Sequence, residues 1–500
     1  MKKKNNLLAT VLIFFCLTIG LILRLYNLNS AIADHHSHRQ ADTASVSRHL
    51  LQKTGTFLIP TYHDISNVQS GLDNPHGYRM VEMPIYNSIS VYFYKIFQPI
   101  FPNLNIEISS RLVSVIFSLL SASLIFSLVY KYSHLFWPAY LSMLTFLINP
   151  FSVYYSRTIL PQSTAIFFML LSLNLFNSHI FLASISLSLA ILTSPFTAIL
   201  AFPVLIFLGL QKYPKQKISL TIFHFVLFST ISLIPFLLWR NWTKHFIAGV
   251  PFNKWLFIKD RHFLGVNNWT PDPPSTFWQS LIPFKAYWFK WLFLKRISQL
   301  ILGTFGVVPL FLSFVYRHKK IPQLLISFWS AITIYFISIA GGNIQHDYYQ
   351  SLILPYLFTS IGIGLYYISR YTFTNKLIAK LSVILILIIF NYLSFDQIKE
   401  FYKINNPIII EAGQKVQQLI PKSALVIAPY TGDTAFLYQT QHSGWPTQIY
   451  DVKKLFANQA IYLVSTTFDN YTQKMISKYP SIYKDKKFVI LKIYTPPNES

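Results

Sequence analysis

The run LLATVLIFFCLTIGLIL at residues 7–23 decides the fold class. It is apolar and closely follows Lys2, Lys3 and Lys4. A signal peptide begins in the same way, but no small-residue cleavage site follows this run. Its length approaches the roughly 20 residues with which a helix crosses a bilayer. We therefore predict that residues 7–23 form an uncleaved membrane anchor.

Ten further apolar runs bring the predicted number of transmembrane helices to eleven. They lie near residues 111–130, 135–155, 159–177, 179–195, 197–211, 218–239, 297–316, 321–340, 351–369 and 377–394. Of the 500 residues, 53% are hydrophobic and 12% are charged, and the mean hydropathy is +0.41. Soluble domains have roughly 25% charged residues. The composition therefore excludes a soluble enzyme, a disordered chain and a fibrous repeat.

Basic residues in the short loops predict the orientation in the cell membrane. With eleven spans and a cytoplasmic N-terminus, these residues fall on the cytoplasmic side, and the short outer loops hold Arg157 and almost no other. The cytoplasmic set is Lys131, Lys212, Lys215, Lys217, Arg317, Lys319, Lys320, Arg370, Lys376 and Lys380. Counting the apolar stretch 83–101 as a span would reverse this pattern. We therefore predict that 83–101 is an aromatic-rich helix in the outer interface of the membrane.

This topology leaves three large segments outside the cell membrane, at 26–110, 240–296 and 395–500. Every acidic residue that precedes the tail then lies on the outer side, so carboxylate chemistry must occur there. These residues are Asp34, Asp42, Asp64, Asp73, Glu82, Glu107, Asp260, Asp272 and Asp347. The net charge of +25 suits anionic headgroups and anionic lipid substrates rather than nucleic acid.

The tail differs in character from the rest of the chain. Helical patterning at 408–420 precedes the short apolar runs ALVIA (424–428), AIYLV (460–464) and FVILKIY (488–494). We predict a transmembrane domain at 1–394 and a small extracytoplasmic α/β domain at 395–500. The tail has no glycine-rich phosphate loop, so no nucleotide site is predicted there.

Asp42 is the first candidate for chemistry, in the stretch DHHSHRQADTASVSRHL (34–50). A carboxylate here could act as a general base that takes a proton from an incoming hydroxyl or amine. Aspartate is also a preferred N-cap, and Asp42 lies where a short helix is expected to begin. The pattern alone leaves both roles open.

Three histidines in the same stretch raise the question of a divalent metal. His35, His36 and His38 lie close together, but no pair has the i, i+4 spacing of a metal-binding helix. The single cysteine, Cys16, lies in an apolar run and excludes both an intrachain disulfide and a cysteine-based metal site. No cofactor is therefore predicted with certainty, and a divalent metal stays open.

Two further stretches on the outer side hold candidate residues. In YRMVEMPIYNSISVYFYKIF (78–97), Glu82 lies just before Pro84, where a helix is expected to begin. Glu82 could cap the helix N-terminus, where the helix dipole favours a negative charge, or it could orient a substrate beside Arg79. In GGNIQHDYYQ (341–350), His346 and Asp347 are adjacent in a short loop, followed by two tyrosines typical of a membrane interface.

Four motifs in order resemble one enzyme family. The runs HRQADTASVSRHL (38–50), EMPIYNSISVYFYKIF (82–97), RTILPQS (157–163) and HDYYQSLILPY (346–356) are similar to the bacterial branch of the GT-C glycosyltransferases. This is the branch similar to protein O-mannosyltransferases and to the aminoarabinose transferase of lipid A, whose members typically read HSWRQADTA, EMPLY and HDYY. The match covers the spans and outer loops but not securely the tail.

The resemblance implies a polytopic enzyme that transfers a sugar from a polyprenyl-phosphate donor to a lipid, glycan or protein acceptor at the outer face. It implies that Asp42 is the base. We predict Glu82 as a second catalytic candidate. The predicted substrate-binding residues are Arg39, Gln40, Arg79, Tyr86, Arg157, His346, Asp347 and Tyr348.

Two positions depart from the family pattern. Gln162 stands where relatives often carry an acid, and Met83 stands where the lipid A branch carries a lysine near the donor phosphate. Another cation must therefore serve there, Arg79 or Arg39. Arginine suits a phosphate because its planar fork can bind two oxygens.

Two other classes of function compete with the enzyme. A flippase for lipid-linked saccharides would be expected to carry charges within its spans, and no charge lies in the middle of a predicted span. A non-catalytic membrane scaffold would not explain why Asp42, Glu82 and the HDYY loop lie on one face. Together with the resemblance, these arguments favour a membrane glycosyltransferase over a flippase or a scaffold. With Asp42 acting from the side opposite the phosphate, the transfer would invert the anomeric carbon.

Overall fold

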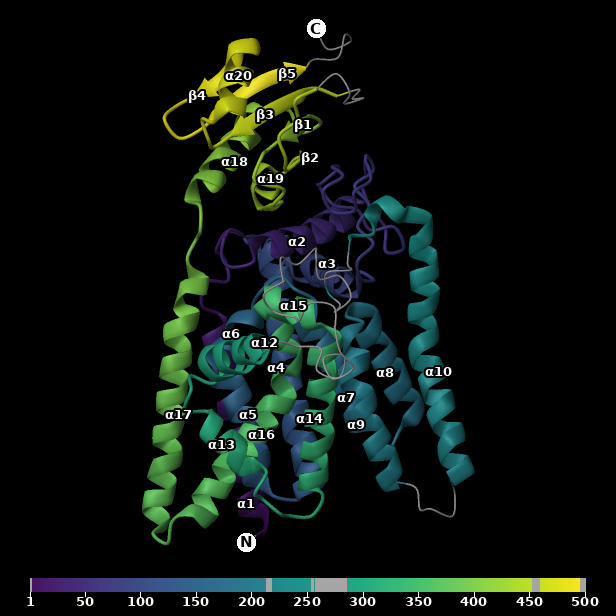
Figure 1. The fold of residues 1–500 in the computed structure, drawn as a ribbon, viewed down its shortest axis with the longest axis vertical. Helices are drawn as coiled ribbons and strands as arrows, with labels where there is room; N and C mark the ends of the chain where they lie inside the picture. The colour runs from purple at the N-terminus through teal and green to yellow at the C-terminus, as the bar shows by residue number, and fades with distance from the viewer. Residues whose placement is uncertain (1, 213–217, 253–255, 257–285, 452–458, 495–500) are drawn as a thin grey trace. The chain divides into compact units, whose positions relative to one another are not determined.

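The computed structural model describes residues 2–212, 218–252, 256, 286–451 and 459–494 (Figure 1). The chain divides into two compact units. The first comprises Met1–Leu28, Arg111–Trp239 and Asn253–Glu400, and the second comprises Asn29–Ser110, Arg240–Phe252 and Phe401–Ser500. Four residues used to predict the topology, Lys215, Lys217, Asp260 and Asp272, lie outside the described residues.

The first unit is helical. Its elements are α1 (Lys2–Arg24), α4 (Ile106–Ser133), α5 (Phe136–Ile148), α6 (Pro150–Tyr155), α7 (Gln162–Leu175), α8 (Ile180–Thr193), α9 (Phe196–Lys212), α10 (Ile218–Trp242), α12 (Ala286–Phe289), η5 (Lys290–Ile301), α13 (Val307–Ser313), α14 (Ile321–Ser338), α15 (Ala340–Gln345), η6 (Asp347–Ile353), α16 (Leu354–Tyr367), η7 (Ile368–Thr372), α17 (Lys376–Ile398) and η8 (Lys399–Tyr402). Helices α4 and α10 run on into the second unit at one end, as does η8.

Six helical segments among the described residues are long and apolar enough to cross a membrane. They are Leu7–Arg24, Ile106–Ser133, Ile222–Gly249, Ile321–Ser338, Asp347–Thr372 and Lys376–Leu419. Four shorter apolar helices accompany them, at Phe136–Ile148, Gln162–Leu175, Ile180–Thr193 and Phe196–Leu210. The prediction of a polytopic helical membrane protein is confirmed, whereas eleven crossings stays a prediction.

Two of the predicted spans are not single helices. The run 297–316 contains the end of the π-helix η5, a turn, and the short helix α13. Gly303 in this turn has a φ of +46°, and a Cβ there would overlap the carbonyl oxygen of Phe390 in α17. The run 135–155 breaks at Asn149, which is extended because the residue before a proline avoids the helical region.

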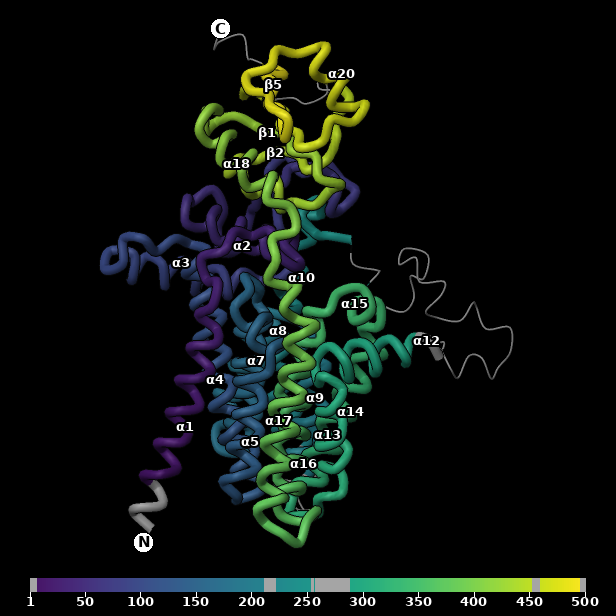
Figure 2. The backbone as a smooth tube through the Cα atoms, turned by 90° about the vertical axis from the view of Figure 1, so that its left-hand side faces the viewer, coloured from purple at the N-terminus to yellow at the C-terminus, as the bar shows by residue number. Residues whose placement is uncertain are grey.

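The second unit combines two helices of the first outer segment with the tail. Helices α2 (Ser37–Gln52) and α3 (Ile85–Phe97) pack side by side, as Figures 1 and 2 both show. The tail adds α18 (Pro407–Leu419), α19 (Ala435–Thr440) and α20 (Asn470–Lys478). A short 3₁₀ segment, η2 (Thr243–Gly249), also belongs to this unit.

The tail forms the predicted α/β fold around a five-stranded sheet. The strands are β1 (Leu425–Ile427), β2 (Gly444–Trp445), β3 (Ile461–Ser465), β4 (Ser481–Lys484) and β5 (Val489–Tyr494), in the order β2-β1-β3-β5-β4. Strand β1 is parallel to β2 and β3, and β5 is antiparallel to β3 and β4. The apolar runs predicted β1, β3 and β5. Strands β2 and β4 were missed because one has two residues and the other is mostly exposed.

The stretch 83–101 is helical, as predicted, over α3. Its inner face holds Tyr86 and Ser90, which are buried, whereas Tyr92 and Ile96 are 66% and 62% exposed. A helix that exposes large apolar side chains on one face is typical of a membrane interface. Location at that interface stays a prediction.

Candidate functional site

Asp42 lies inside helix α2 and does not cap it. The helix begins at Ser37 after His36, whose backbone is left-handed and whose side chain makes no capping hydrogen bond. Asp42 follows in the second turn and is 1% exposed. The N-cap alternative for Asp42 is therefore wrong. A buried carboxylate in a helix interior requires partners that compensate its lost hydration.

Both oxygens of the Asp42 carboxylate have such partners in the second unit. The Arg79 guanidinium donates from Nη2 to Asp42 Oδ2 at 2.6 Å. The Thr434 hydroxyl donates to Asp42 Oδ1 at 2.7 Å. The carboxylate is thereby held at both ends, by a cation from the segment before α3 and by a hydroxyl from the tail.

Arg79 is itself fixed by its surroundings. Its Nη1 donates to Gln69 Oε1 at 3.2 Å, and its Cζ lies 5.0 Å from the centre of the Tyr62 ring. The Nε of Arg79 is buried and has no hydrogen-bond partner among the described residues. A buried N–H without a partner is costly, so this atom is suited to bind an incoming oxygen.

Electrostatics keep Asp42 ionised. Burial on its own would raise the pKa of Asp42, but the Arg79 guanidinium and the Thr434 hydroxyl outweigh it and hold that pKa below its ordinary value. The neighbouring carboxyl Asp64 behaves in the opposite way, since burial raises its pKa to about 6. The pKa values of these two buried carboxyls thus shift in opposite directions, because only Asp42 is paired with an arginine.

A pocket opens beside Asp42 within the second unit. Its volume is about 250 Å³ with the open mouth included. It is lined by Arg39, Asp42, Thr43, Val46, Pro60, Arg79, Val81, Glu82, Pro84 and Asn87. Two cations and two carboxylates therefore face one small, partly open space.

Glu82 is paired with Arg39 across this pocket. Arg39 Nη2 donates to Glu82 Oε1 at 2.6 Å, and the two side chains are 13% and 12% exposed. Helix α3 begins after Pro84 with no side-chain capping hydrogen bond, so Glu82 does not cap it. The structure therefore brings together Asp42, Glu82, Arg39 and Arg79, which the sequence analysis singled out from two separate motifs.

Gln40 and Tyr86 make other contacts. Gln40 Nε2 donates to Asp34 Oδ1 at 2.8 Å and to the His35 carbonyl at 3.1 Å. The Tyr86 hydroxyl donates to the Ser110 carbonyl at 2.8 Å, which ties α3 to the start of α4. Both side chains are 1% exposed and lie outside the pocket lining.

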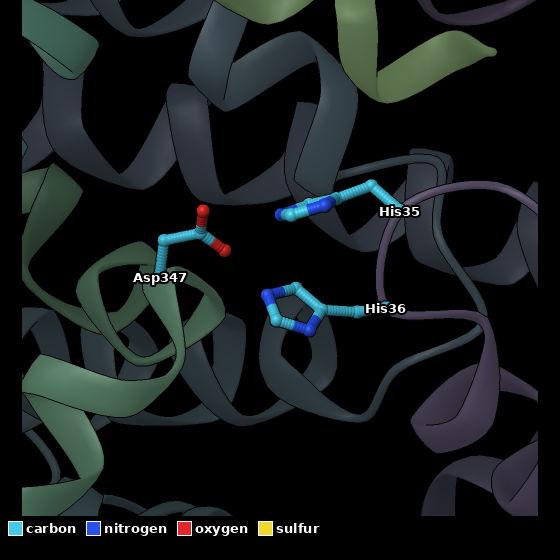
Figure 3. Close-up of side chains that lie close together, drawn as sticks. All are labelled: His35, His36 and Asp347. Carbon is cyan, nitrogen blue, oxygen red and sulfur yellow. The ribbon is translucent and has the colours of Figure 1, made fainter. Parts of the chain in front are cut away.

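Two adjacent histidines of the second unit, His35 and His36, are among the described residues that could offer a ligand to a metal ion. Figure 3 shows their imidazole rings next to each other. The ring centres are 4.1 Å apart and the ring planes are tilted by 52°. His35 also stacks on Phe401 at 3.8 Å, which is an ordinary packing role. Imidazole nitrogens bind Zn²⁺ readily, but a structural site takes four ligands, so two rings alone do not define one. The Asp347 carboxylate in the same figure belongs to the first unit.

Asp347 of the HDYY motif is held by two side chains of the first unit. Arg296 Nη1 donates to Asp347 Oδ2 at 2.9 Å, and the Tyr155 hydroxyl donates to Asp347 Oδ1. Asp347 is 2% exposed. His346 is half-buried and stacks on Tyr348, with ring centres 5.2 Å apart. Arg296 lies on the π-helix η5, a geometry often found at functional sites.

Arg157 and Gln162 lie in the RTILPQS motif of the first unit. Arg157 is 1% exposed, donates to the Asn27 carbonyl at 3.0 Å and lies over the Tyr154 ring. Gln162 borders a pocket of about 300 Å³ with its open space included, lined by serines of α4, α6, α7 and η6. Its buried Oε1 accepts no hydrogen bond among the described residues. The amide at this position thus has no cationic partner of the kind an acid would require.

Three residues of these arrangements were missed by the sequence analysis. Thr434 carries no signal, because a lone threonine in a tail loop is ordinary. Tyr155 lies two residues before Arg157 of the RTILPQS motif and follows another tyrosine, and Arg296 ends a run with two lysines, so each was hidden among similar neighbours. Their roles depend on partners far along the chain.

Solved structures share this fold. ArnT from Cupriavidus metallidurans bound to undecaprenyl phosphate matches with a TM-score of 0.64 and 13% identity, over 96% of this chain and 97% of that chain. The Archaeoglobus fulgidus oligosaccharyltransferase matches with a TM-score of 0.58 and 11% identity, over 92% and 69%. The arabinofuranosyltransferase AftD from mycobacteria matches with a TM-score of 0.52 and 10% identity, over 97% and 42%.

These structures are GT-C proteins, so the resemblance drawn from the motifs is confirmed in the fold. At 10–13% identity the likeness establishes the fold alone. No protein-family model matches the sequence, and comparison with curated proteins gives no match either.

Proposed function

We propose that this chain is an integral-membrane glycosyltransferase that moves a sugar from a polyprenyl-phosphate donor to an acceptor at the extracytoplasmic face. The observation that carries the proposal is the Asp42–Arg79 pair in a pocket that also exposes Arg39 and Glu82. The fold supports the donor class, since a structure of the same fold was determined with undecaprenyl phosphate bound.

The chemistry requires a base and a phosphate site. The acceptor oxygen or nitrogen attacks the anomeric carbon of the sugar, and its proton passes to Asp42. The bond from that carbon to the phosphate oxygen breaks, and its electron pair leaves with polyprenyl phosphate. Arg79 and Arg39 stabilise the phosphate charge. Attack from the side opposite the phosphate inverts the anomeric carbon.

The other predicted substrate-binding residues fall into two groups, according to the contacts that their side chains make. We propose that Gln40, Tyr86 and Arg157 maintain the shape of their units, because each is buried and bonded within its own unit. His346, Asp347 and Tyr348 form a bonded and stacked group that we propose contributes to substrate binding.

The test is a transfer assay with the purified protein in lipid nanodiscs. A panel of polyprenyl-phosphate sugars is supplied, and the release of polyprenyl phosphate is measured with and without EDTA. We expect release from one class of donor only. If every donor stays intact while a fluorescent lipid-linked sugar crosses proteoliposomes that hold the protein, the chain is a flippase and the proposal fails. Loss of release in EDTA would show that a metal ion is required.

The orientation of the chain gives a separate prediction. In a Cys16→Ser background, Lys422→Cys places a thiol on an exposed tail residue, and Lys320→Cys places one on an exposed residue before α14. With an N-in, C-out topology, a membrane-impermeant maleimide should label position 422 in intact cells and position 320 only after lysis. The reverse pattern would contradict an extracytoplasmic site.

A further inference from the structure

The two anchors of the Asp42 carboxylate come from opposite parts of the sequence. Arg79 precedes Asp42's neighbouring helix α3, whereas Thr434 belongs to the tail, 392 residues after Asp42. We propose that Thr434 is a positioning residue for Asp42, so that the α/β tail is a working part of the transfer site. This inference rests on the function proposed above.

The direction of the Thr434 hydroxyl follows from its two acceptors. Thr434 Oγ1 lies 2.7 Å from Asp42 Oδ1 and 3.3 Å from the His38 carbonyl oxygen. Its single proton favours the carboxylate, because a hydrogen bond to an ionised acceptor is shorter and stronger than one to a neutral carbonyl. Thr434 is 1% exposed, so water does not compete for this bond.

Backbone contacts fix Thr434 in this place. The Gly444 N–H donates to the His63 carbonyl at 2.9 Å, and the Ile65 N–H donates to the Gly444 carbonyl at 3.0 Å. His63 Nε2 lies 3.2 Å from the Thr434 carbonyl oxygen. Strand β2 of the tail thus pairs with the 63–65 segment, and the loop before α19 is held against α2.

A second contact joins α19 to α2. The Arg48 guanidinium lies 4.0 Å from the centre of the Tyr438 ring and donates to the Tyr438 carbonyl at 3.4 Å. The Tyr438 hydroxyl and Arg48 both contact the Glu107 carboxylate. The tail therefore contacts the first outer segment at Thr434 itself, at Tyr438 and at Gly444, and these contacts hold the Thr434 hydroxyl beside Asp42.

Fixing both oxygens matters for a base. A carboxylate oxygen has two lone-pair directions, so an oxygen that accepts one hydrogen bond can still accept a proton. With Thr434 on one oxygen and Arg79 on the other, the carboxylate does not rotate about its Cβ–Cγ bond. The unused lone pairs then point in constant directions beside the pocket. Removing the hydroxyl frees this rotation and removes a hydrogen bond that favours the ionised form.

The test compares three variants of the full chain. Thr434→Val removes the hydroxyl at nearly constant volume, Thr434→Ser keeps it, and Thr447→Val makes the same change at a half-buried tail threonine. We expect kcat to fall about ten- to a hundredfold in Thr434→Val, as for a lost hydrogen bond to a charged group. Thr434→Ser and Thr447→Val should retain most of the activity, and donor affinity should not change in any of them.

The pH profile separates positioning from a general defect. Several groups act on Asp42 by charge or hydrogen bond, and their contribution should be common to all variants: Arg79, His38, His63, Asp64 and Asp433. The acid limb of the pH profile, where kcat falls as Asp42 becomes protonated, should shift to higher pH in Thr434→Val. In Thr434→Ser it should lie at the wild-type pH. Near-normal kcat with an unshifted limb in Thr434→Val would overturn the inference. Equal losses in Thr434→Val and Thr447→Val would overturn it too, because they would indicate a tail defect.

A measurement that does not depend on transfer activity distinguishes a failure of this inference from a failure of the proposed function. The carboxyl band of Asp42 is isolated by infrared difference between the wild type and Asp42→Asn, and is titrated in the wild type and in Thr434→Val. An upward shift of the Asp42 pKa in Thr434→Val supports the bond even where no donor is used. An unshifted pKa overturns the inference by itself. A wild type inactive with every donor overturns the proposed function, and a shifted pKa would then show the Thr434–Asp42 bond without a role in transfer.

Discussion

Replacing Asp42 by asparagine should reduce sugar transfer by a factor on the order of 10² to 10⁴, because the site loses its base. Asparagine keeps the shape of the side chain, and its amide oxygen can still accept the Thr434 hydroxyl. Arg79 loses its counter-charge, so the melting temperature should fall as well. Activity is therefore measured as kcat per folded protein, in fractions that elute as a single species.

Asp64→Asn is the matched control. Asp64 is a fully buried carboxyl of the same unit, but it lies outside the pocket lining and its pKa is raised to about 6. The Ser66 N–H donates a hydrogen bond to Asp64 Oδ1 at 2.8 Å, and an asparagine oxygen can still accept this bond. We expect this variant to retain most of the transfer rate. Near-normal turnover of Asp42→Asn would contradict the assignment, and Glu82 would then be the candidate base.

The pH dependence follows from the lowered pKa of Asp42. A base must be ionised, so the rate should be flat near neutral pH and fall only as the pH drops through the Asp42 pKa, below the ordinary value of about 3.9. Stability from the Asp42 ion pair has the same sign, since it is present above the unfolded pKa and is lost on acidification. The residual activity of Asp42→Asn should lack this acid limb.

Replacing Arg79 by lysine should weaken donor binding by about tenfold or more, although the charge is kept. A lysine can still pair with Asp42, but it loses the bond to Gln69, the contact with the Tyr62 ring and the buried Nε. Donor affinity is measured by titrating a fluorescent polyprenyl phosphate. The acid limb of the rate should stay in place, because the cation beside Asp42 remains.

Arg39→Lys is the comparison for this prediction. Arg39 lines the same pocket but is paired with Glu82, so the lysine keeps the main contact of the side chain. We expect a smaller loss of affinity than for Arg79→Lys. Unchanged affinity in both variants would remove the arginines from the donor site and direct attention to Arg296 in the first unit.

The tail shows which secondary-structure elements local sequence patterns can predict and which they cannot. Its helix at 408–420 and its three apolar runs predicted α18, β1, β3 and β5, because apolar periodicity over a few residues is a local property. The two strands that were missed have no apolar run of their own. The span predicted at 297–316 is not a single helix for a related reason, since the turn at Gly303 and Thr304, both with positive φ, breaks a run that composition alone reads as continuous.

The roles left open for Asp42 and Glu82 illustrate the opposite limit. Both acids lie near predicted helix starts, where capping is common. The structure excludes capping for both, because α2 begins five residues before Asp42 and α3 begins without a side-chain cap. Each acid is instead paired with an arginine of the other motif.

The sequence by itself determined the membrane class, the helical character of the chain, the α/β tail and the motifs that contain Asp42, Arg79 and Glu82. These features depend on composition, on periodicity and on residues close together in the chain, so they can be predicted before the chain is folded. Only the tertiary structure decided which groups meet. Arg79 lies 37 residues and Thr434 lies 392 residues from Asp42 along the chain. A buried carboxylate needs charged or hydrogen-bonding partners because burying it unpaired costs free energy. That cost arises only once distant segments have packed together and removed water.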